Sequence, residues 1–189
     1  MPAWWVGKMY REKDPDNNKS LKLKLFKEQF QFCAYSEKRC ESAISYDVEH
    51  FNPTIKYKDD YYNYYAVLRQ YNLQKGKKKY IHDTSFFQNP EEFQKRIHLV
   101  RDDNYVVLYD SVDENDQEAL DLIELLGFNH PDLALERKKR LNRLKFISNS
   151  IDLTSYLFNF PEDLDFISSI EFVFSMDLSK FLQADETES

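Results

Sequence analysis

The sequence predicts an α+β protein made of short antiparallel strands and amphipathic helices. Three short runs rich in apolar or aromatic residues are bounded by polar turn residues, as is typical of strands, at 43–50, 96–100 and 105–109. Three longer segments place apolar residues at helical spacing, at 21–32, 116–126 and 131–146. A chain of 189 residues can bury a substantial core, in one domain or in one domain with an extension.

The first half of the chain is expected to form a helix, a strand and a second short helix, separated by loops. Ser20 is a suitable N-cap for the first helix. Asn52-Pro53 breaks the chain after the strand. We expect a polar loop at 11–20, the first helix at 21–32 and a turn or short hairpin at 33–41. The strand is expected at 43–50, an irregular aromatic stretch at 59–67 and the short helix at 72–76.

The second half is expected to form a hairpin followed by helices. Gly127 is a C′ cap for one helix, and Pro131 opens the next. The basic run from Arg137 to Arg140 is expected to be mainly a solvated helix face. We expect a loop at 83–90, one helical turn at 91–95 and two hairpin strands at 96–100 and 105–109. Helices are expected at 116–126 and 131–146, further helix at 147–175, and an acidic, disordered tail from Ala184, at 184–189.

Composition excludes several classes of protein. No run of eighteen apolar residues is present, so no membrane span is expected, and the N-terminus lacks the apolar core of a signal peptide. Only Cys33 and Cys40 are present, which predicts inert or buried thiols in a reducing, bacterial cytoplasm. Three glycines cannot supply a glycine-rich phosphate loop.

The net charge of −7 is unevenly distributed. Residues 1–82 carry sixteen Lys and Arg against ten Asp and Glu, whereas residues 83–189 carry ten against twenty-three. Binding depends on local clusters of charge rather than on the net charge of the chain. The basic first half is therefore able to face a polyanion, and the acidic second half is able to dock a partner or to keep the protein soluble.

The motif with the clearest chemistry lies between Asp47 and Asn72. Glu49 and His50 are adjacent, Asn63 follows thirteen residues later and Asn72 nine after that. Phosphodiester hydrolysis needs a proton acceptor, for which His is suited near neutral pH. It also needs a divalent cation, and hard cations prefer oxygen ligands such as Glu and the Asn amide. Adjacent strand side chains point to opposite faces, so Glu49 and His50 can serve different sides of one bond.

This pattern resembles the HNH endonuclease family, whose core is a ββα-metal unit. Asp47-Val48-Glu49-His50-Phe51-Asn52-Pro53 is most similar to its E-H-F-x-P branch, which includes the PtuB-like nucleases of Septu antiphage systems and the nucleases of some retrons. Cys33-Ala34-Tyr35-Ser36-Glu37 resembles the C-A-Y-C-E of that branch. Downstream, the residues that fall in the order of the branch are Ile123-Glu124-Leu125-Leu126, Asn129, Leu133 and Arg137, so the resemblance covers roughly 25–145.

The resemblance implies a ββα-metal core with helical N- and C-terminal extensions, divided at 1–32, 33–82 and 83–189. It implies that His50 is the general base and that Glu49 and Asn72 bind Mg²⁺ or another divalent cation such as Mn²⁺. Asn63, grouped with His50 in the catalytic set, would brace the loop rather than react. A purely structural role for Asn63, as a cap or turn residue of the loop, is nearly the same as that bracing role.

Many members of the family hold a structural zinc with two C-x-x-C pairs. The matching positions here are Cys33, Ser36, Leu68 and Tyr71. Zinc needs four donors, so no structural zinc is expected, and apolar packing is expected to replace it.

The expected partners are DNA and an ATPase of a defence complex. Lys75, Lys77, Lys78 and Lys79 follow the motif helix, and the run is either a phosphate contact or a solvated surface. The cluster of tyrosines at 61–65 favours packing over base stacking. Two functions stay open: a metal-dependent nuclease acting on DNA, as the effector of an antiviral system, and an inactive subunit of the same fold that binds nucleic acid or a partner ATPase.

Overall fold

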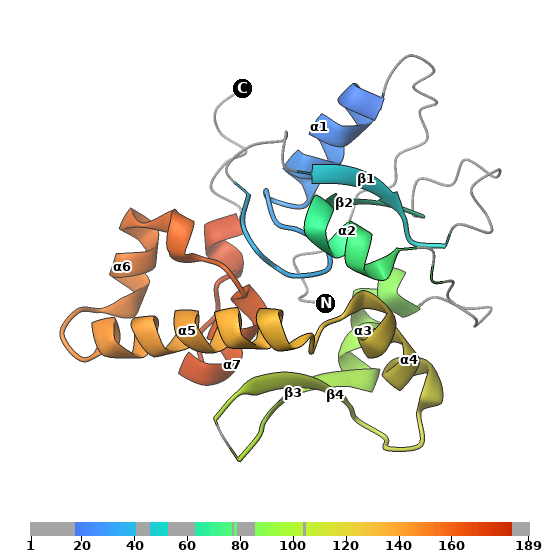
Figure 1. The fold of residues 1–189 in the computed structure, drawn as a ribbon. Coiled ribbons are helices and arrows are strands. Elements are labelled where there is room, and N and C mark those ends of the chain that lie inside the picture. Colours follow the sequence, from blue (N-terminus) through green and yellow to red (C-terminus); the bar gives the residue numbers. More distant parts are fainter. Residues whose placement is uncertain are drawn as a thin grey trace.

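The computed structural model describes residues 18–40, 46–52, 63–76, 78, 86–103 and 105–182 (Figure 1). The helices and strands in these ranges are α1 Asn18–Glu28, β1 Tyr46–His50, β2 Tyr64–Leu68, α2 Arg69–Lys75, α3 Pro90–Arg96, β3 Ile97–Arg101, β4 Val107–Ser111, α4 Gln117–Leu126, α5 Pro131–Ser148, α6 Leu153–Asn159 and α7 Ile167–Phe174. Short 3₁₀ turns lie at Phe86–Gln88, Pro161–Asp163 and Ser179–Leu182. The α+β prediction is confirmed, with two small antiparallel sheets of two strands each in the described residues.

The first sheet is the hairpin of β1 and β2, and α2 follows β2 directly. Tyr46 pairs with Leu68 at one end and His50 with Tyr64 at the other. The prediction of irregular chain up to residue 67 was wrong for β2. The three central residues of β2 are all buried, so the strand lacks the alternation of apolar and polar residues that marks a half-buried strand. The second helix was expected at residue 72 and begins at Arg69, without a side-chain cap to mark its start.

Helix α1 covers this hairpin. The Gln29 amide, just after α1, donates to the carbonyl oxygen of Ala66 at 2.9 Å and accepts from the Ala66 amide at 2.8 Å. The Tyr46 hydroxyl donates to the carbonyl oxygen of Gln31, and the Tyr46 ring packs edge-on against Phe26. Helix α1 ends at Glu28 rather than at residue 32, because Phe30 and Gln31 adopt positive φ angles that turn the chain toward the hairpin.

The second sheet is the hairpin of β3 and β4, which confirms the prediction of paired strands around 96–109. Helix α3, longer than the predicted single turn, leads into β3 and is capped by Asn89. Arg96 joins this unit to α4 through ion pairs with Asp116 and Glu118. The Arg96 guanidinium lowers the pKa of the Asp116 carboxyl, so the pair stays charged near neutral pH.

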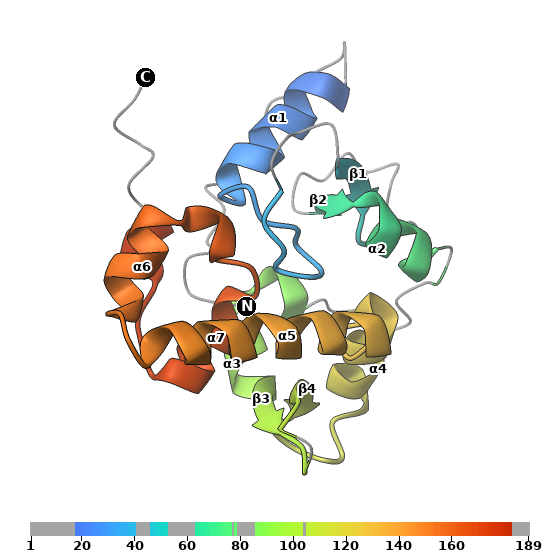
Figure 2. The same cartoon turned by 60° about the vertical axis from the view of Figure 1, so that its left-hand side comes forward.

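Helix α5 crosses the middle of the molecule, between the β1–β2–α2 unit and the β3–β4 hairpin in both views (Figure 1, Figure 2). Gly127 adopts the left-handed conformation after α4, and Pro131 opens α5, as predicted. The prediction that Arg137 lies on a solvated helix face was wrong. Arg137 is 2% exposed and donates to the carbonyl oxygens of Val107 and Phe128.

The further helix expected at 147–175 is confirmed by α6 and α7. Arg140 of α5 holds the chain before α7 through ion pairs with Asp163 and Asp165. The predicted tail from Ala184 and residues 11–17 of the loop predicted at 11–20 lie outside the described residues. The prediction was wrong for 18–20, because α1 already begins at Asn18 and Ser20 lies inside it rather than at its N-cap. No helix among the described residues is both long enough and apolar enough to span a membrane.

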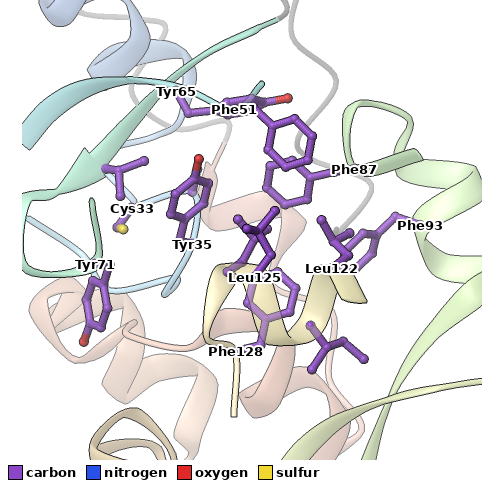
Figure 3. Close-up of a cluster of buried hydrophobic side chains, with 14 of the residues drawn as sticks. Cys33, Tyr35, Phe51, Tyr65, Tyr71, Phe87, Phe93, Leu122, Leu125 and Phe128 are labelled. Carbon is purple, nitrogen blue, oxygen red and sulfur yellow. The ribbon is translucent and has the colours of Figure 1, made fainter. Parts of the chain in front are cut away.

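An aromatic core joins the elements on both sides of α5. Figure 3 shows Phe51 and Tyr65 from the first hairpin beside Phe87, with Phe93 and Leu122 from α3 and α4 next to it. The rings of Phe51 and Phe87 stack at 5.1 Å and 16°. The core cluster begins at Leu25 and extends to Phe166, so all three segments named from the sequence contribute to it. It therefore fixes the end of β1, where the candidate site lies, against the second half of the chain.

Candidate functional site

Strand β1 directs two carboxylates at helix α2. Asp47 and Glu49 are two residues apart and therefore share one face of the strand. Asp47 accepts from the Asn72 amide at 3.2 Å and pairs with Arg69 at 3.3 Å. Glu49 pairs with Lys75, whose Nζ lies 2.5 Å from its Oε1. The strand–strand–helix order thus brings predicted ligands Glu49 and Asn72 to one interface, together with Asp47, which had been assigned no role.

His50 is the last residue of β1 and is half-buried. Its ring lies on Tyr64, its partner across the hairpin, with the ring centroids 4.6 Å apart and tilted by 55°. The His50 carbonyl oxygen accepts from Lys75 at 3.2 Å. The imidazole therefore lies on Tyr64 while the neighbouring Glu49 carboxylate faces α2, the division between two faces expected for adjacent strand residues.

Asn63 is buried immediately before β2 and clamps the chain that leaves β1. Its side-chain oxygen accepts from the Asn52 amide at 2.7 Å, and its side-chain nitrogen donates to the Asn52 carbonyl oxygen at 2.9 Å. Its own carbonyl oxygen accepts from the Phe51 amide. Asn129 makes the same two-way contact with the backbone of Tyr109 in the second half of the chain. Asn63 thus fixes the two residues that follow His50.

Replacing Asn63 with Ala is expected to destabilise the protein by about 1–3 kcal/mol, because it removes two hydrogen bonds and leaves the Asn52 amide and carbonyl without them. Urea unfolding measures the change. Asn159→Ala is the matched control, since Asn159 is exposed and makes one local bond to Ser155. Equal, small losses in both variants would show that the clamp adds nothing to stability.

The donor set fits a hard divalent cation in its chemistry. Glu49 and Asp47 offer carboxylate oxygens, and Asn72 offers an amide oxygen. Within the described ranges, no group of three His, Cys, Asp or Glu side chains is close enough to hold a metal ion. A cation here would therefore use the oxygen of Asn72 beside the carboxylates, with water filling the remaining positions.

The positions that match the zinc ligands of the family lie together. The Leu68 amide donates to Cys33 Sγ at 3.3 Å, and Cys33 and Tyr71 belong to the aromatic core with Leu68 packed against it. Burial raises the pKa of the Cys33 thiol, which keeps it protonated near neutral pH. Figure 3 shows Cys33 above Tyr71, beside Tyr35. Ser36, the fourth position, is buried, and its hydroxyl accepts from the Lys38 amide at 3.3 Å. These positions thus combine apolar packing with weak local hydrogen bonds.

The lysines expected to meet phosphate differ in their surroundings. Lys75 is buried, and a phosphate contact would require an exposed ammonium, so its geometry does not suit that role. Lys78 is exposed and lines a groove of about 490 Å³ between α2 and α4. Lys77 and Lys79 lie outside the described residues. The pairing of Lys75 with Glu49 was missed, although the spacing from Asn72 to Lys75 signals that both lie on one helical face.

Comparisons with protein-family models, with curated proteins and with solved structures find no match for this chain.

Proposed function

We propose that the chain is a metal-dependent endonuclease of the HNH type that hydrolyses phosphodiester bonds in DNA. One observation carries the proposal. A strand–strand–helix unit brings Glu49 and Asn72 to one interface, places His50 on the adjacent position of the strand and locks the following loop with Asn63.

The residues divide the work between the two faces of β1. His50 accepts the proton of the attacking water through its imidazole, which the tilted Tyr64 ring supports from one side. Glu49 and Asn72 would hold the divalent cation, and Asp47 would keep the Asn72 amide oriented by accepting from its nitrogen. Asn63 keeps the chain after His50 in one conformation, so that the imidazole and the carboxylates stay in fixed positions.

A bound Mg²⁺ or Mn²⁺ would neutralise charge on the phosphate and stabilise the leaving oxygen. Lys78, with Lys77 and Lys79 in the same run, would contact the backbone phosphates without reading sequence. By the resemblance of the motif, the proposed setting is an antiviral defence system of the bacterial cytoplasm, in which an ATPase is the partner.

A second candidate is an inactive subunit that keeps the fold and binds nucleic acid or a partner ATPase. One observation favours it: the Glu49 carboxylate already holds a buried ammonium. The exposed acidic residues of the second half, including Asp103, Asp110, Asp113 and Glu114, would form the docking surface. Charge of this kind sets association rate and specificity, so partner binding would weaken with salt.

Cleavage assays separate the two candidates. Purified protein is incubated with supercoiled plasmid, a single-stranded DNA and a single-stranded RNA, each with Mg²⁺, Mn²⁺ or EDTA. A nuclease nicks or cuts DNA with metal and leaves it intact in EDTA. Intact substrates under all metals, together with retained nucleic-acid binding in a gel-shift assay, would favour the inactive subunit.

A further inference from the structure

Lys75 is a buried lysine at the centre of the candidate site. Its side chain is 1% exposed, and its ammonium lies 2.5 Å from Glu49 and 3.2 Å from the His50 carbonyl oxygen. A lysine is seldom buried to this degree unless a partner compensates its charge. Glu49 supplies that compensation, so the proposed metal ligand and the buried ammonium form one unit.

The second cation of α2 provides a contrast within the same helix. Arg69 pairs with Asp47 at 3.3 Å, and its side chain is 71% exposed. Solvent screens that pair, whereas the Lys75–Glu49 pair is shielded from water. The two basic and two acidic side chains balance without any metal ion. A divalent cation at Glu49 therefore meets a positive charge that is already in place.

We propose that Lys75 is an internal competitor of the divalent cation: its ammonium and the cation hold Glu49 in turn. This inference rests on the metal-ligand role proposed for Glu49. Binding of the cation requires the ammonium to leave Glu49, which weakens metal binding in the resting protein. Lys75 is the last residue of α2, and its four-carbon stem allows the ammonium to move while the helix stays in place.

Metal titration of Lys75→Met and Arg69→Met tests the competition. Both changes remove one positive charge from α2, but only the first removes it from a buried pair. In calorimetric titration with MnCl₂, Lys75→Met is expected to bind Mn²⁺ at least about tenfold more tightly than the wild type does. A tenfold change corresponds to the lower end of the coupling energies found for close charge pairs. Arg69→Met is expected to bind Mn²⁺ nearly as the wild type does, because its charge is screened.

A second measurement covers the case in which Lys75→Met folds poorly without metal. Leaving Glu49 without its partner is expected to lower Tm in EDTA, and Mn²⁺ should raise the Tm of this variant more than that of the wild type. Lys75→Gln, which keeps a hydrogen-bond donor, gives a milder form of the same test. Adding Glu49→Gln to Lys75→Met should remove the gained affinity.

The outcomes separate this inference from the proposed function. Indistinguishable Mn²⁺ affinity and indistinguishable metal-dependent Tm in Lys75→Met and the wild type would overturn the competition, even if the wild type cuts DNA. Tighter Mn²⁺ binding that depends on Glu49 would support it, even if neither protein cuts DNA, and the nuclease proposal alone would then fail. Equal gains in Lys75→Met and Arg69→Met would also overturn it, since the effect would be one of general charge.

Discussion

His50→Ala is expected to reduce metal-dependent DNA cleavage by about 10²- to 10⁴-fold, the usual contribution of a general base. The imidazole is half-buried against Tyr64, so its removal should leave the hairpin paired and DNA binding nearly intact. Single-turnover nicking of plasmid with Mg²⁺ measures the loss, and a gel shift without metal measures binding. His98→Ala is the matched control, because His98 is exposed on β3 in the second sheet.

Metal dependence distinguishes the base from the ligands. Glu49→Ala and Asn72→Ala weaken cation binding, so higher Mn²⁺ should partly restore their cleavage by mass action. His50→Ala should show no such recovery, since added metal does not supply the missing proton acceptor. Cleavage by His50→Ala at the wild-type rate would contradict the role of this motif in a nuclease.

Arg137→Met is expected to destabilise the protein by about 3 kcal/mol or more, because two buried carbonyl oxygens lose a charged donor. The guanidinium donates to Val107 at 2.7 Å and to Phe128 at 2.9 Å, and it lies over the ring of Tyr109. It thereby joins α5 to β4 and to the end of α4. Urea unfolding followed by far-UV circular dichroism measures the change.

Two further variants sharpen this prediction. Lys139→Met removes a charge from an exposed position of the same helix and should change stability by less than about 0.5 kcal/mol. Arg137→Lys keeps the charge but loses the planar fork, so it should recover only part of the lost stability. If Arg137→Met were as stable as Lys139→Met, the contacts of Arg137 with β4 and with the chain after α4 would add nothing to stability.

The sequence predicts elements where a local signal and the tertiary environment agree. Gly127 and Pro131 mark helix ends by their own conformational limits, so these boundaries were correct. Tyr64–Leu68 was missed because helices cover the sheet and bury its central residues together. Arg137 was placed at the surface because its carbonyl partners belong to distant elements that no local pattern reveals.

The candidate site follows the same division. The spacing of Glu49, His50, Asn63 and Asn72 led to residues that lie on β1 or contact β1 and the chain that follows it. Lys75 was grouped with the lysine run, as a phosphate contact or a solvated surface, and both roles require an exposed ammonium. Its burial depends on how closely α2 packs on β1, which only the folded structure reveals.

The Gln29 side chain has a consequence for how the protein meets other chains. A two-stranded sheet has an open edge on each strand, whose unpaired amides and carbonyls can recruit a further strand from another molecule. On β2, the outward amide and carbonyl of Ala66 are both occupied by the Gln29 carboxamide, and the Ala34 amide shares the same carbonyl. The glutamine thus acts as a one-residue substitute for a neighbouring strand at the middle of β2, where it opposes strand addition and edge-to-edge aggregation.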